Sequence, residues 1–417
     1  MKIGIITLGC KVNQYESDAI AEELEKMGHI VTTKIEPCDM YVINTCAVTT
    51  IAERKSREYV SRFKKISPNA KVIVCGCASE HNQQQFLSHD NVSLVIGTGG
   101  KNKIAKVLDH IGNAKIEIPK QYESFVTNST ISKNRAYLKI QDGCNNFCTY
   151  CLIPYVRGRS RSRLLQDIVD EAQQLEKTAK EIDITGINIS DYRIDGKLAF
   201  DKLMLALSTS KCRIRLGSIE VNIIDENLLK ILSQMPNFCP HFHLSMQSGC
   251  NRILKLMNRR YTKEQFLQKV EMIRKYFPNV ALTTDVIVGF PTETDEDFAE
   301  TVETIRKINY FSMHIFPYSK RDGTIASKMP SCDGNAVNRR IKVLEEINAQ
   351  NKQNYILSQR DKTLVCLTEN FDGKFVYGHT ENYIKVYLPD GTPQNQFVKV
   401  TNLRPFLDGA TAKILKS

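Results

Sequence analysis

Short apolar runs alternate with amphipathic stretches along the N-terminal quarter of the chain. The runs at 2–7, 40–45 and 71–76 predict buried strands, and residues 17–27 and 53–65 have the apolar spacing of helices. Strands that alternate with helices form a parallel sheet covered by helices. We therefore expect an N-terminal α/β domain with a parallel sheet over residues 1–112, followed by a polar, irregular linker over residues 113–133.

The alternation resumes in longer units over residues 134–357. Strands are predicted at 137–141, 181–186, 213–218, 241–247, 282–289 and 311–319, with helical patterns between them. These βα units predict a central, partial TIM-like (βα)6 barrel. In such barrels the catalytic residues gather at the C-terminal ends of the strands.

The segment at 358–417 has a different pattern, in which short alternating strands are joined by turns rich in Gly, Asp and Asn. This pattern predicts a small C-terminal β-barrel, a shape that often binds oligonucleotides. The predicted fold class is therefore α/β, with a small all-β domain at the C-terminal end.

Composition and charge narrow the class of protein. The 417 residues contain no apolar run long enough to span a membrane and no signal-peptide pattern, so we expect a cytoplasmic protein without a membrane segment. In that location thirteen cysteines, an odd number, favour metal or redox chemistry over a disulfide framework. A net charge of +11 favours a polyanionic partner, although an enzyme can be basic without one. Neither a GxGxxG nor a Walker motif supports nucleotide binding of the usual kinds.

Three cysteines follow the first predicted strand of the barrel, in "DGCNNFCTYC": Cys144, Cys148 and Cys151. A structural zinc site normally has four ligands, a disulfide is unfavourable in the cytoplasm, and a loop of this composition is a poor place for buried thiols. Thiolates also ligate iron–sulfur clusters. With three thiolates on a four-iron cluster, one iron is left open to the amino and carboxylate groups of S-adenosylmethionine (SAM).

Three further cysteines lie in loops that each follow an N-terminal strand: Cys10, Cys46 and Cys77. The loops after parallel strands converge at one edge of a sheet, so these thiols can meet and hold a second cluster. The alternative is that they are independent small hydrophobic residues. Cys75 ends its strand, and we expect its side chain to lie in the core instead.

In this context the CxxxCxxC spacing, with Tyr150 before the last cysteine, resembles the radical SAM superfamily. Together with the N-terminal cysteines it resembles one family, the methylthiotransferases, over essentially the whole chain. The motifs that carry this resemblance include "TLGCKVNQYES", "NTCAVT", "GCNNFCTYCLIPYVRGRSRSR", "TTDVIVGFPTETDEDF" and "FPYSKRDGT". The family combines an N-terminal domain, a radical core and a C-terminal TRAM barrel.

Within this family, "GCKVNQYES" is most similar to the branch that acts on N6-threonylcarbamoyladenosine at position 37 of tRNA. The branch acting on N6-isopentenyladenosine tends to have Gln-Met-Asn where this chain has Lys11-Val12-Asn13. The branch acting on an aspartate of a ribosomal protein is less similar. The resemblance therefore predicts an enzyme that modifies the tRNA anticodon stem-loop. A non-catalytic RNA-binding protein with structural zinc sites is the competing hypothesis.

The resemblance implies methylthiolation of carbon 2 of the adenine, with two 4Fe-4S clusters and two SAM molecules. One SAM methylates sulfur held at the cluster of Cys10, Cys46 and Cys77. The second is cleaved at the other cluster to a 5′-deoxyadenosyl radical, which activates the C–H position. Such an enzyme needs an electron donor such as flavodoxin or ferredoxin.

Residues at the ends of the barrel strands are the candidates for SAM binding, each with an alternative role in a turn or at the barrel mouth. They are Tyr150, Gly186, Asn188, Ser218, Glu220, Gln247, Ser248, Gly289 and Phe290.

Basic residues beside the cysteine loop and in the C-terminal barrel are the candidates for RNA binding, because arginine forks suit phosphates and a looped strand can present a base to a pocket. They are Arg157, Arg159, Arg161, Arg163, Lys374 and Lys385. Charge runs of this kind are also common on solvated faces, and the barrel has a dimer contact or folding cap as its alternative role.

Overall fold

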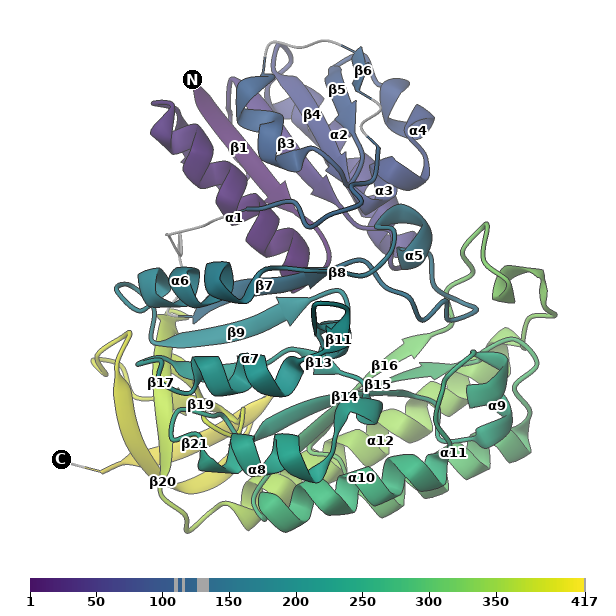
Figure 1. Cartoon of the computed structure of the whole chain (residues 1–417), viewed down its shortest axis with the longest axis vertical. Coiled ribbons are helices and arrows are strands. Elements are labelled where there is room, and N and C mark those ends of the chain that lie inside the picture. Colours follow the sequence, from purple (N-terminus) through teal and green to yellow (C-terminus); the bar gives the residue numbers. More distant parts are fainter. Residues whose placement is uncertain (109–111, 115–116, 126–134, 416–417) are drawn as a thin grey trace.

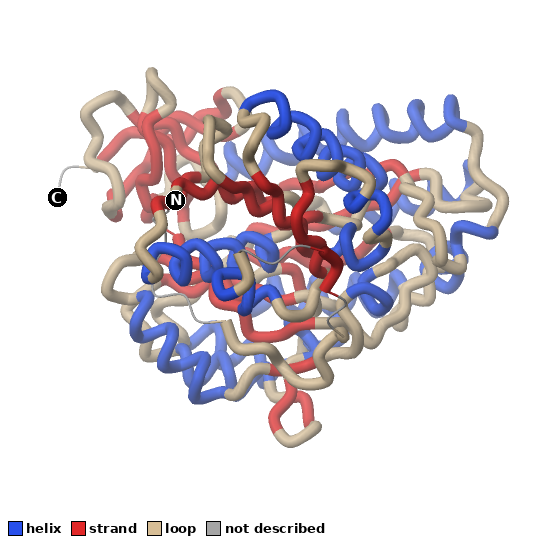
Figure 2. The backbone as a smooth tube through the Cα atoms, turned by 90° about the horizontal axis from the view of Figure 1, so that it is seen from above, coloured by secondary structure: helices blue, strands red, loops and turns tan. Residues whose placement is uncertain are grey.

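The computed structural model describes residues 1–108, 112–114, 117–125 and 135–415. Figure 1 shows the N-terminal domain above the central domain, with the C-terminal barrel packed at the lower left. Viewed from above in Figure 2, the N-terminal domain lies in front and the C-terminal strands stand to one side. The predicted linker at 113–133 lies partly outside the described residues.

The N-terminal domain contains one parallel sheet with the strand order β2-β1-β3-β4-β5-β6. Its strands are β1 (Lys2–Thr7), β2 (Ile30–Thr32), β3 (Met40–Thr45), β4 (Lys71–Gly76), β5 (Val92–Ile96) and β6 (Gly112–Ala114). Its helices are α1 (Lys11–Lys26), α2 (Thr50–Ile66), α3 (Cys77–His81), α4 (Gln84–Leu87) and the 3-10 helix η1 (Lys101–Lys106). Both sheet faces carry apolar cores, and on one of them Phe63 of α2 stacks on Tyr41 with ring centroids 3.8 Å apart.

The central domain is built on parallel strands that follow one another round a partial barrel, which confirms the (βα)6 prediction. They are β7 (Arg135–Asp142), β9 (Glu181–Gly186), β12 (Arg213–Leu216) with its continuation β13 (Ser218–Ile219), β14 (His241–Gln247), β15 (Ala281–Val288) and β16 (Ser312–Pro317). Gly217 divides β12 from β13. Its N–H donates to the Ile184 carbonyl at 2.8 Å, and a side chain here would clash with that oxygen.

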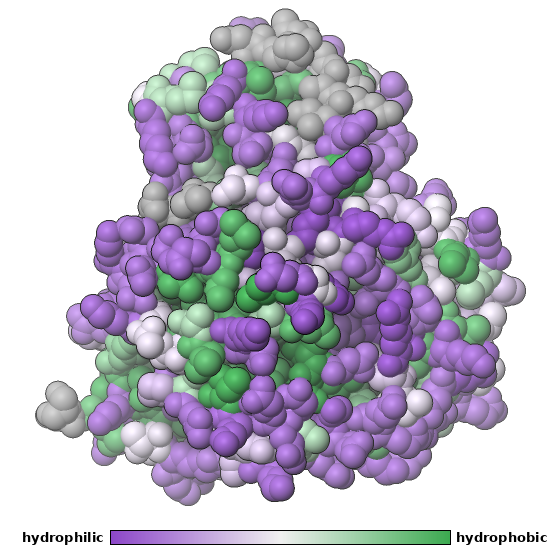
Figure 3. Space-filling model, in the orientation of Figure 1, coloured by the Kyte–Doolittle hydropathy of each residue, from purple (hydrophilic) through white to green (hydrophobic). Residues whose placement is uncertain are grey.

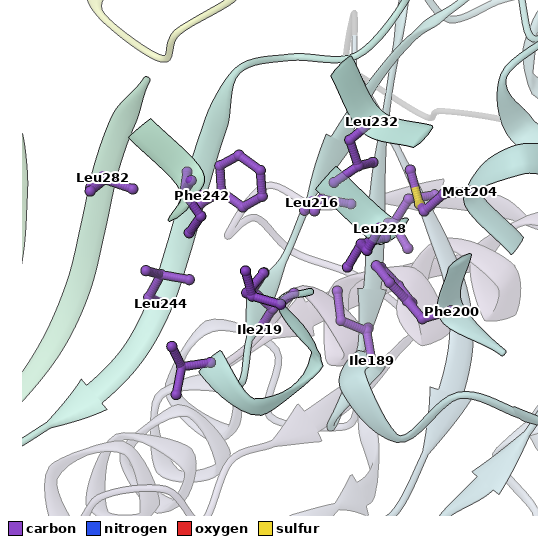
Figure 4. Close-up of a cluster of buried hydrophobic side chains, with 14 of the residues drawn as sticks. Ile189, Phe200, Met204, Leu216, Ile219, Leu228, Leu232, Phe242, Leu244 and Leu282 are labelled. Atoms are coloured by element: carbon purple, nitrogen blue, oxygen red, sulfur yellow. The ribbon is translucent and has the colours of Figure 1, made fainter. Parts of the chain in front are cut away.

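The outer layer of this domain consists of helices α6 (Leu165–Leu175), α7 (Phe200–Leu207), α8 (Glu226–Gln234), α10 (Lys263–Tyr276), α11 (Asp295–Ile308) and α12 (Gly334–Ser358). Their apolar faces and the strands form one continuous core, part of which is drawn in Figure 4. There Phe242 and Leu244 of β14 lie near Leu282 of β15. This core fixes the strands whose ends carry the site.

Short elements connect these units. They are α5 (Ile153–Val156), β8 (Arg161–Ser162), η2 (Ile189–Asp191), β10 (Arg193–Ile194), β11 (Lys197–Leu198), η3 (Val221–Ile223), α9 (Asn251–Leu256) and η4 (Ala326–Lys328). No helix in the described part of the chain is long and apolar enough to cross a membrane. Hydrophilic side chains cover most of the face seen in Figure 3.

The C-terminal strands close into a barrel with the order β17-β18-β19-β21-β20, which confirms the predicted small β-barrel. They are β17 (Leu364–Phe371), β18 (Val376–Thr380), β19 (Lys385–Leu388), β20 (Phe397–Phe406) and β21 (Gly409–Ile414).

A buried carboxylate attaches this barrel to the central domain. Glu181 pairs with Arg135 at 2.7 Å, with Arg213 at 2.6 Å and with Arg215 at 2.8 Å. Arg213 also donates to the Val365 carbonyl at 2.8 Å, and Arg215 donates to carbonyls at the end of β18. The TRAM-like barrel is therefore held at one end of the central domain by charge-assisted hydrogen bonds.

Candidate active site

Three thiols meet at the C-terminal edge of the N-terminal sheet. Cys10 immediately precedes α1, Cys46 follows β3, and Cys77 begins α3 after β4. Cys10 and Cys77 are close enough to Cys46 that their charges add to burial in raising the pKa of the Cys46 thiol to about 12. Cys75 lies in a different apolar cluster with its side chain in the core, as the sequence predicted.

A glycine makes room for this group of thiols. Gly9 has a φ of +101°, in the range that favours glycine. A β-carbon at this position would lie 2.7 Å from the sulfur of Cys46. The "LGC" sequence therefore allows the loop carrying Cys10 to approach Cys46.

Arg157 connects this edge of the sheet to the central domain. Its Nε donates to the Cys77 sulfur at 3.3 Å. Its two terminal nitrogens donate to Glu16 at 2.8 Å, to Asp142 at 3.1 Å and to Asn13 at 2.6 Å. The side chain is 1% exposed, so these are charge-assisted bonds in a low-dielectric setting.

The buried network around Arg157 has more cations than carboxylates. Lys101 pairs with Glu16 at 2.6 Å, and Lys139 pairs with Glu16 at 2.8 Å and with Asp142 at 2.7 Å. Burial alone would raise the pKa of Glu16, but the three cations lower it well below its usual range. Arg161 also lies 3.8 Å from Asp142, so the cations outnumber the two carboxylates. Arg157 acts to lower the pKa values of Cys10 and Cys46, but burial outweighs this effect and both pKa values are raised.

The second group of thiols lies in the loop after β7: Cys144, Cys148 and Cys151. The backbone N–H groups of Asn146 and Ile153 each donate to a sulfur of this group at 3.4 Å. Burial and the neighbouring thiols raise the pKa of Cys144 to about 11 and that of Cys151 to about 12. These thiols therefore need a bound cation to be held as thiolates.

Both groups offer thiols alone as donor atoms. All-thiolate donor sets are typical of iron–sulfur clusters and of structural zinc sites. A structural zinc site normally has four protein ligands, whereas each group here supplies three cysteines.

A cavity of about 750 Å³ joins the three domains at the barrel interior. Gly9 and Cys10 line it from the N-terminal domain, Gly186 and Ser218 from the central strands, and Tyr383 from the C-terminal barrel. A second cavity, of about 210 Å³, lies beside Cys148. A molecule in the larger cavity would therefore contact the loop of the first cysteine trio and the C-terminal ends of the barrel strands.

Comparison with known proteins agrees with this arrangement. Residues 138–305 match the radical SAM superfamily, and residues 2–97 match the family described as uncharacterized protein family UPF0004. The threonylcarbamoyladenosine tRNA methylthiotransferase MtaB of Bacillus subtilis is 35% identical over 98% of this chain and 96% of its own length. MtaB of Aquifex aeolicus is 37% identical over 93% of this chain and 96% of its own length. The chain belongs to the MtaB branch of the radical SAM methylthiotransferases.

The chain is also similar to proteins outside the MtaB branch. A tRNA-2-methylthio-N6-dimethylallyladenosine synthase of Thermoanaerobacter is 36% identical over 84% of this chain and 77% of its own length. The radical SAM methyltransferase TsrM of Kitasatospora setae shares the fold, with a TM-score of 0.58 and 12% identity over 78% of this chain and 74% of its own. The chain is thus a tRNA methylthiotransferase that uses SAM and a 4Fe-4S cluster, for which Cys144, Cys148 and Cys151 have the superfamily spacing.

Four of the residues predicted to bind SAM in this methylthiotransferase line the cavities. Gly186 and Ser218 lie on the larger cavity, and Asn188 and Glu220 lie on the smaller one. Arg259, which sequence reasoning missed, forms an ion pair with Glu220 and donates to the Cys148 sulfur at 3.5 Å. Its place in "MNRRYT" does not indicate this role, because the sequence does not show which residues from separate loops lie close together.

Three other predicted SAM contacts are buried, and their contact with SAM stays a prediction. Ser248 and Phe290 are at most 1% exposed, and Phe290 is packed between Tyr150 and Tyr318. Gly289 is also buried. Its φ is +72°, and a β-carbon at this position would lie 2.3 Å from the side chain of Val337. Gly289 and Phe290 lie in the turn after β15, and Ser248 lies in the loop after β14; none of the three is among the residues that line the two cavities.

The remaining two predicted contacts are half-buried. Tyr150 packs edge-on against Phe290 with ring centroids 6.4 Å apart. Gln247 ends β14 with a φ of 66°. Neither is among the residues that line the two cavities.

Three of the four neighbouring arginines predicted to contact RNA are buried, and RNA contact stays a prediction for them. Arg157 belongs to the network described above, Arg161 donates to backbone carbonyls, and Arg163 forms a buried ion pair with Glu171. Their guanidinium groups are shielded from solvent. Arg159 is exposed, and its guanidinium lies over the ring of Phe147, 4.5 Å from the centroid.

The two lysines of the C-terminal barrel have different surroundings. Lys374 is exposed in the turn before β18. Lys385 pairs with Asp408 at 3.1 Å and lines the larger cavity. Tyr383 stacks on His241 with centroids 4.4 Å apart, so it belongs to the contact between the barrel and the central domain.

Proposed function

We propose that this enzyme methylthiolates carbon 2 of N6-threonylcarbamoyladenosine at tRNA position 37, using two 4Fe-4S clusters and two SAM molecules. The observation that carries the proposal is the trio of Cys10, Cys46 and Cys77, whose Cys10 lines the same cavity as the ends of the barrel strands. When bound, the clusters and SAM supply the one-electron chemistry that an unactivated C–H bond requires. The protein holds, orients and shields the reacting groups.

Two features support the second cluster at Cys10, Cys46 and Cys77. The thiols are close enough for their charges to interact, and the cations of the buried network beside them outnumber its carboxylates. Iron and sulfide analysis of the anaerobically purified protein tests this: we expect about eight irons per chain. About four irons would refute the second cluster, and zinc without iron would favour an RNA-binding protein.

The larger cavity supports threonylcarbamoyladenosine over the dimethylallyl nucleoside named for other relatives. The threonylcarbamoyl group carries a carboxylate and a hydroxyl, whereas the dimethylallyl group is apolar. Lys11, Lys352 and Lys385 line the cavity, where Lys11 pairs with Asp183 and Lys385 pairs with Asp408. Polar walls of this kind offer hydrogen-bond and charge partners to a polar substituent and would leave an apolar one without partners.

Nucleoside analysis of tRNA from a deletion strain tests the substrate. We expect the methylthio group to be lost from threonylcarbamoyladenosine and restored by the wild-type gene, but not by a variant with Cys144, Cys148 and Cys151 changed to Ala. Loss from isopentenyladenosine would support the first alternative substrate. Unchanged nucleosides with an unmodified aspartate in a ribosomal protein would support the second.

A separate experiment tests whether the two cysteine trios have different roles. Changing Cys10, Cys46 and Cys77 to Ala removes the proposed second cluster without touching the loop after β7. We expect reductive cleavage of SAM to continue while the methylthiolated nucleoside disappears. If a folded variant also stops cleaving SAM, the proposed roles are wrong.

We also propose the domain bounds, the RNA contacts, the location and the electron donor of this enzyme. We divide it into an N-terminal domain at 1–112, a linker at 113–133, a radical core at 134–357 and a TRAM-like barrel at 358–417. Arg159 and Lys374 are the exposed basic residues that we assign to the anticodon stem-loop. We place the enzyme in the cytoplasm with flavodoxin or ferredoxin as its electron donor.

A further inference from the structure

Three polar side chains gather on neighbouring strands of the barrel. His243 lies on β14, Asp285 on β15 and His314 on β16. Asp285 is directly opposite His314 in the parallel pairing, and His243 is opposite Thr283, two residues before Asp285. Side chains two residues apart on a strand share one face. All three therefore lie on the wall of the 750 Å³ cavity.

The ligand atoms of these residues have the spacing of a mononuclear metal site. They all lie within 4.8 Å of one another. One carboxylate oxygen of Asp285 is 3.2 Å from Nε2 of His243, and the other is 3.1 Å from Nδ1 of His314. Nitrogen and oxygen ligands about 2.1 Å from one ion are separated by about 3 Å to 3.5 Å.

The orientation of His243 also points to an ion. His243 is 8% exposed. Its Nε2 makes no hydrogen bond, although a carboxylate oxygen of Asp285 lies nearby. The other ring nitrogen is 3.0 Å from the hydroxyl of Thr283, which also contacts His241 at 2.8 Å. Metal-bound histidines are held in this way, with the second ring nitrogen bonded to a neighbour.

We propose that His243, Asp285 and His314 bind one divalent transition-metal ion of the zinc or ferrous class. Two imidazoles and one carboxylate are suited to such ions, whereas iron–sulfur clusters take thiolates. Three protein ligands leave coordination positions open, and these positions face the cavity. The site is a third metal centre, independent of both cysteine trios and of the identity of the RNA substrate.

Zinc binding to the reconstituted holoenzyme tests this proposal. The protein is incubated with zinc, desalted, and analysed for zinc and iron. We expect one zinc per chain beyond the iron complement in the wild type. Asp285→Asn and His314→Ala should each lower zinc affinity at least about tenfold with iron unchanged.

The chain offers a matched control in the same cavity. His379 also lines it but is paired with Glu369 at 2.8 Å, so His379→Ala should retain the zinc. X-ray absorption at the zinc edge supplies a second readout, in which we expect nitrogen and oxygen neighbours. Any of three results would overturn the proposal. They are no zinc in the iron-replete wild type, zinc retention by the Asp285 and His314 variants equal to that of the wild type, or sulfur neighbours of the zinc.

Discussion

Replacing Arg157 with alanine removes the side chain that joins the N-terminal domain to the radical core. The guanidinium donates to Glu16, to Asp142 and to the amide oxygen of Asn13, all within a region shielded from water. The change leaves Asn13 without this donor and Asp142 with fewer cations. Breaking a buried ion pair by removing one partner costs about 3–5 kcal/mol. Lys101 and Lys139 still neutralise Glu16, so we expect the lower end, about 3 kcal/mol.

Urea unfolding of the anaerobic, reconstituted protein, followed by circular dichroism, measures this cost. Arg157→Lys should lose part of it, because a lysine cannot reproduce the fork between two carboxylates. Arg159→Ala is the matched control, since this exposed arginine makes no buried ion pair, and its effect should stay within about 0.5 kcal/mol. A loss below about 1 kcal/mol in Arg157→Ala would refute the view that this network holds the domains together.

Three further predictions concern the same region. Gly9→Ala places a β-carbon 2.7 Å from the Cys46 sulfur, at a residue whose φ is +101°. The iron content per chain should therefore fall to that of one cluster, and an unchanged iron content would contradict this. Arg159→Ala should weaken tRNA binding and reduce the magnitude of its salt slope by about one, measured by filter binding; an unchanged slope would exclude a phosphate contact. The folded pKa of Glu16 lies below its unfolded value of about 4.3, so its stabilisation is present above that pH and is lost as the pH falls. Glu16→Gln should flatten this part of the acid unfolding curve.

Local pattern predicted β1, β3, β4 and the barrel strands, because their apolar runs are continuous and bounded by polar turns. It missed the buried strand β5, the short strand β6, and β2, a short and largely solvent-accessible edge strand. It also placed the start of the first helix at residue 17, whereas α1 begins at Lys11. The first turns of α1 contain Asn13 and Glu16, which are buried against another domain. Polar residues at buried positions obscure the apolar period on which such predictions depend.

The cysteine trios could be predicted because chain topology alone brings together the loops after parallel strands. The arginine assignments could not, because sequence shows a charge but not its partner. Glu16 precedes Arg157 by 141 positions, yet the two form a buried ion pair at 2.8 Å. The same limit applies to His243, Asp285 and His314, which lie on three separate strands and share no motif spacing.

Helix α1 explains how one short segment can fix the geometry between the two cysteine trios. Cys10 immediately precedes it, Lys11 pairs with Asp183 at the barrel, and Glu16 accepts from cations of the central domain. Successive helical residues are related by about 100° and 1.5 Å, so these contacts define both the rotation and the height of the helix. Cys10 is therefore positioned by the same helix that docks the domain. The distance between the trios is set by packing across the domain interface rather than by the linker at 113–133.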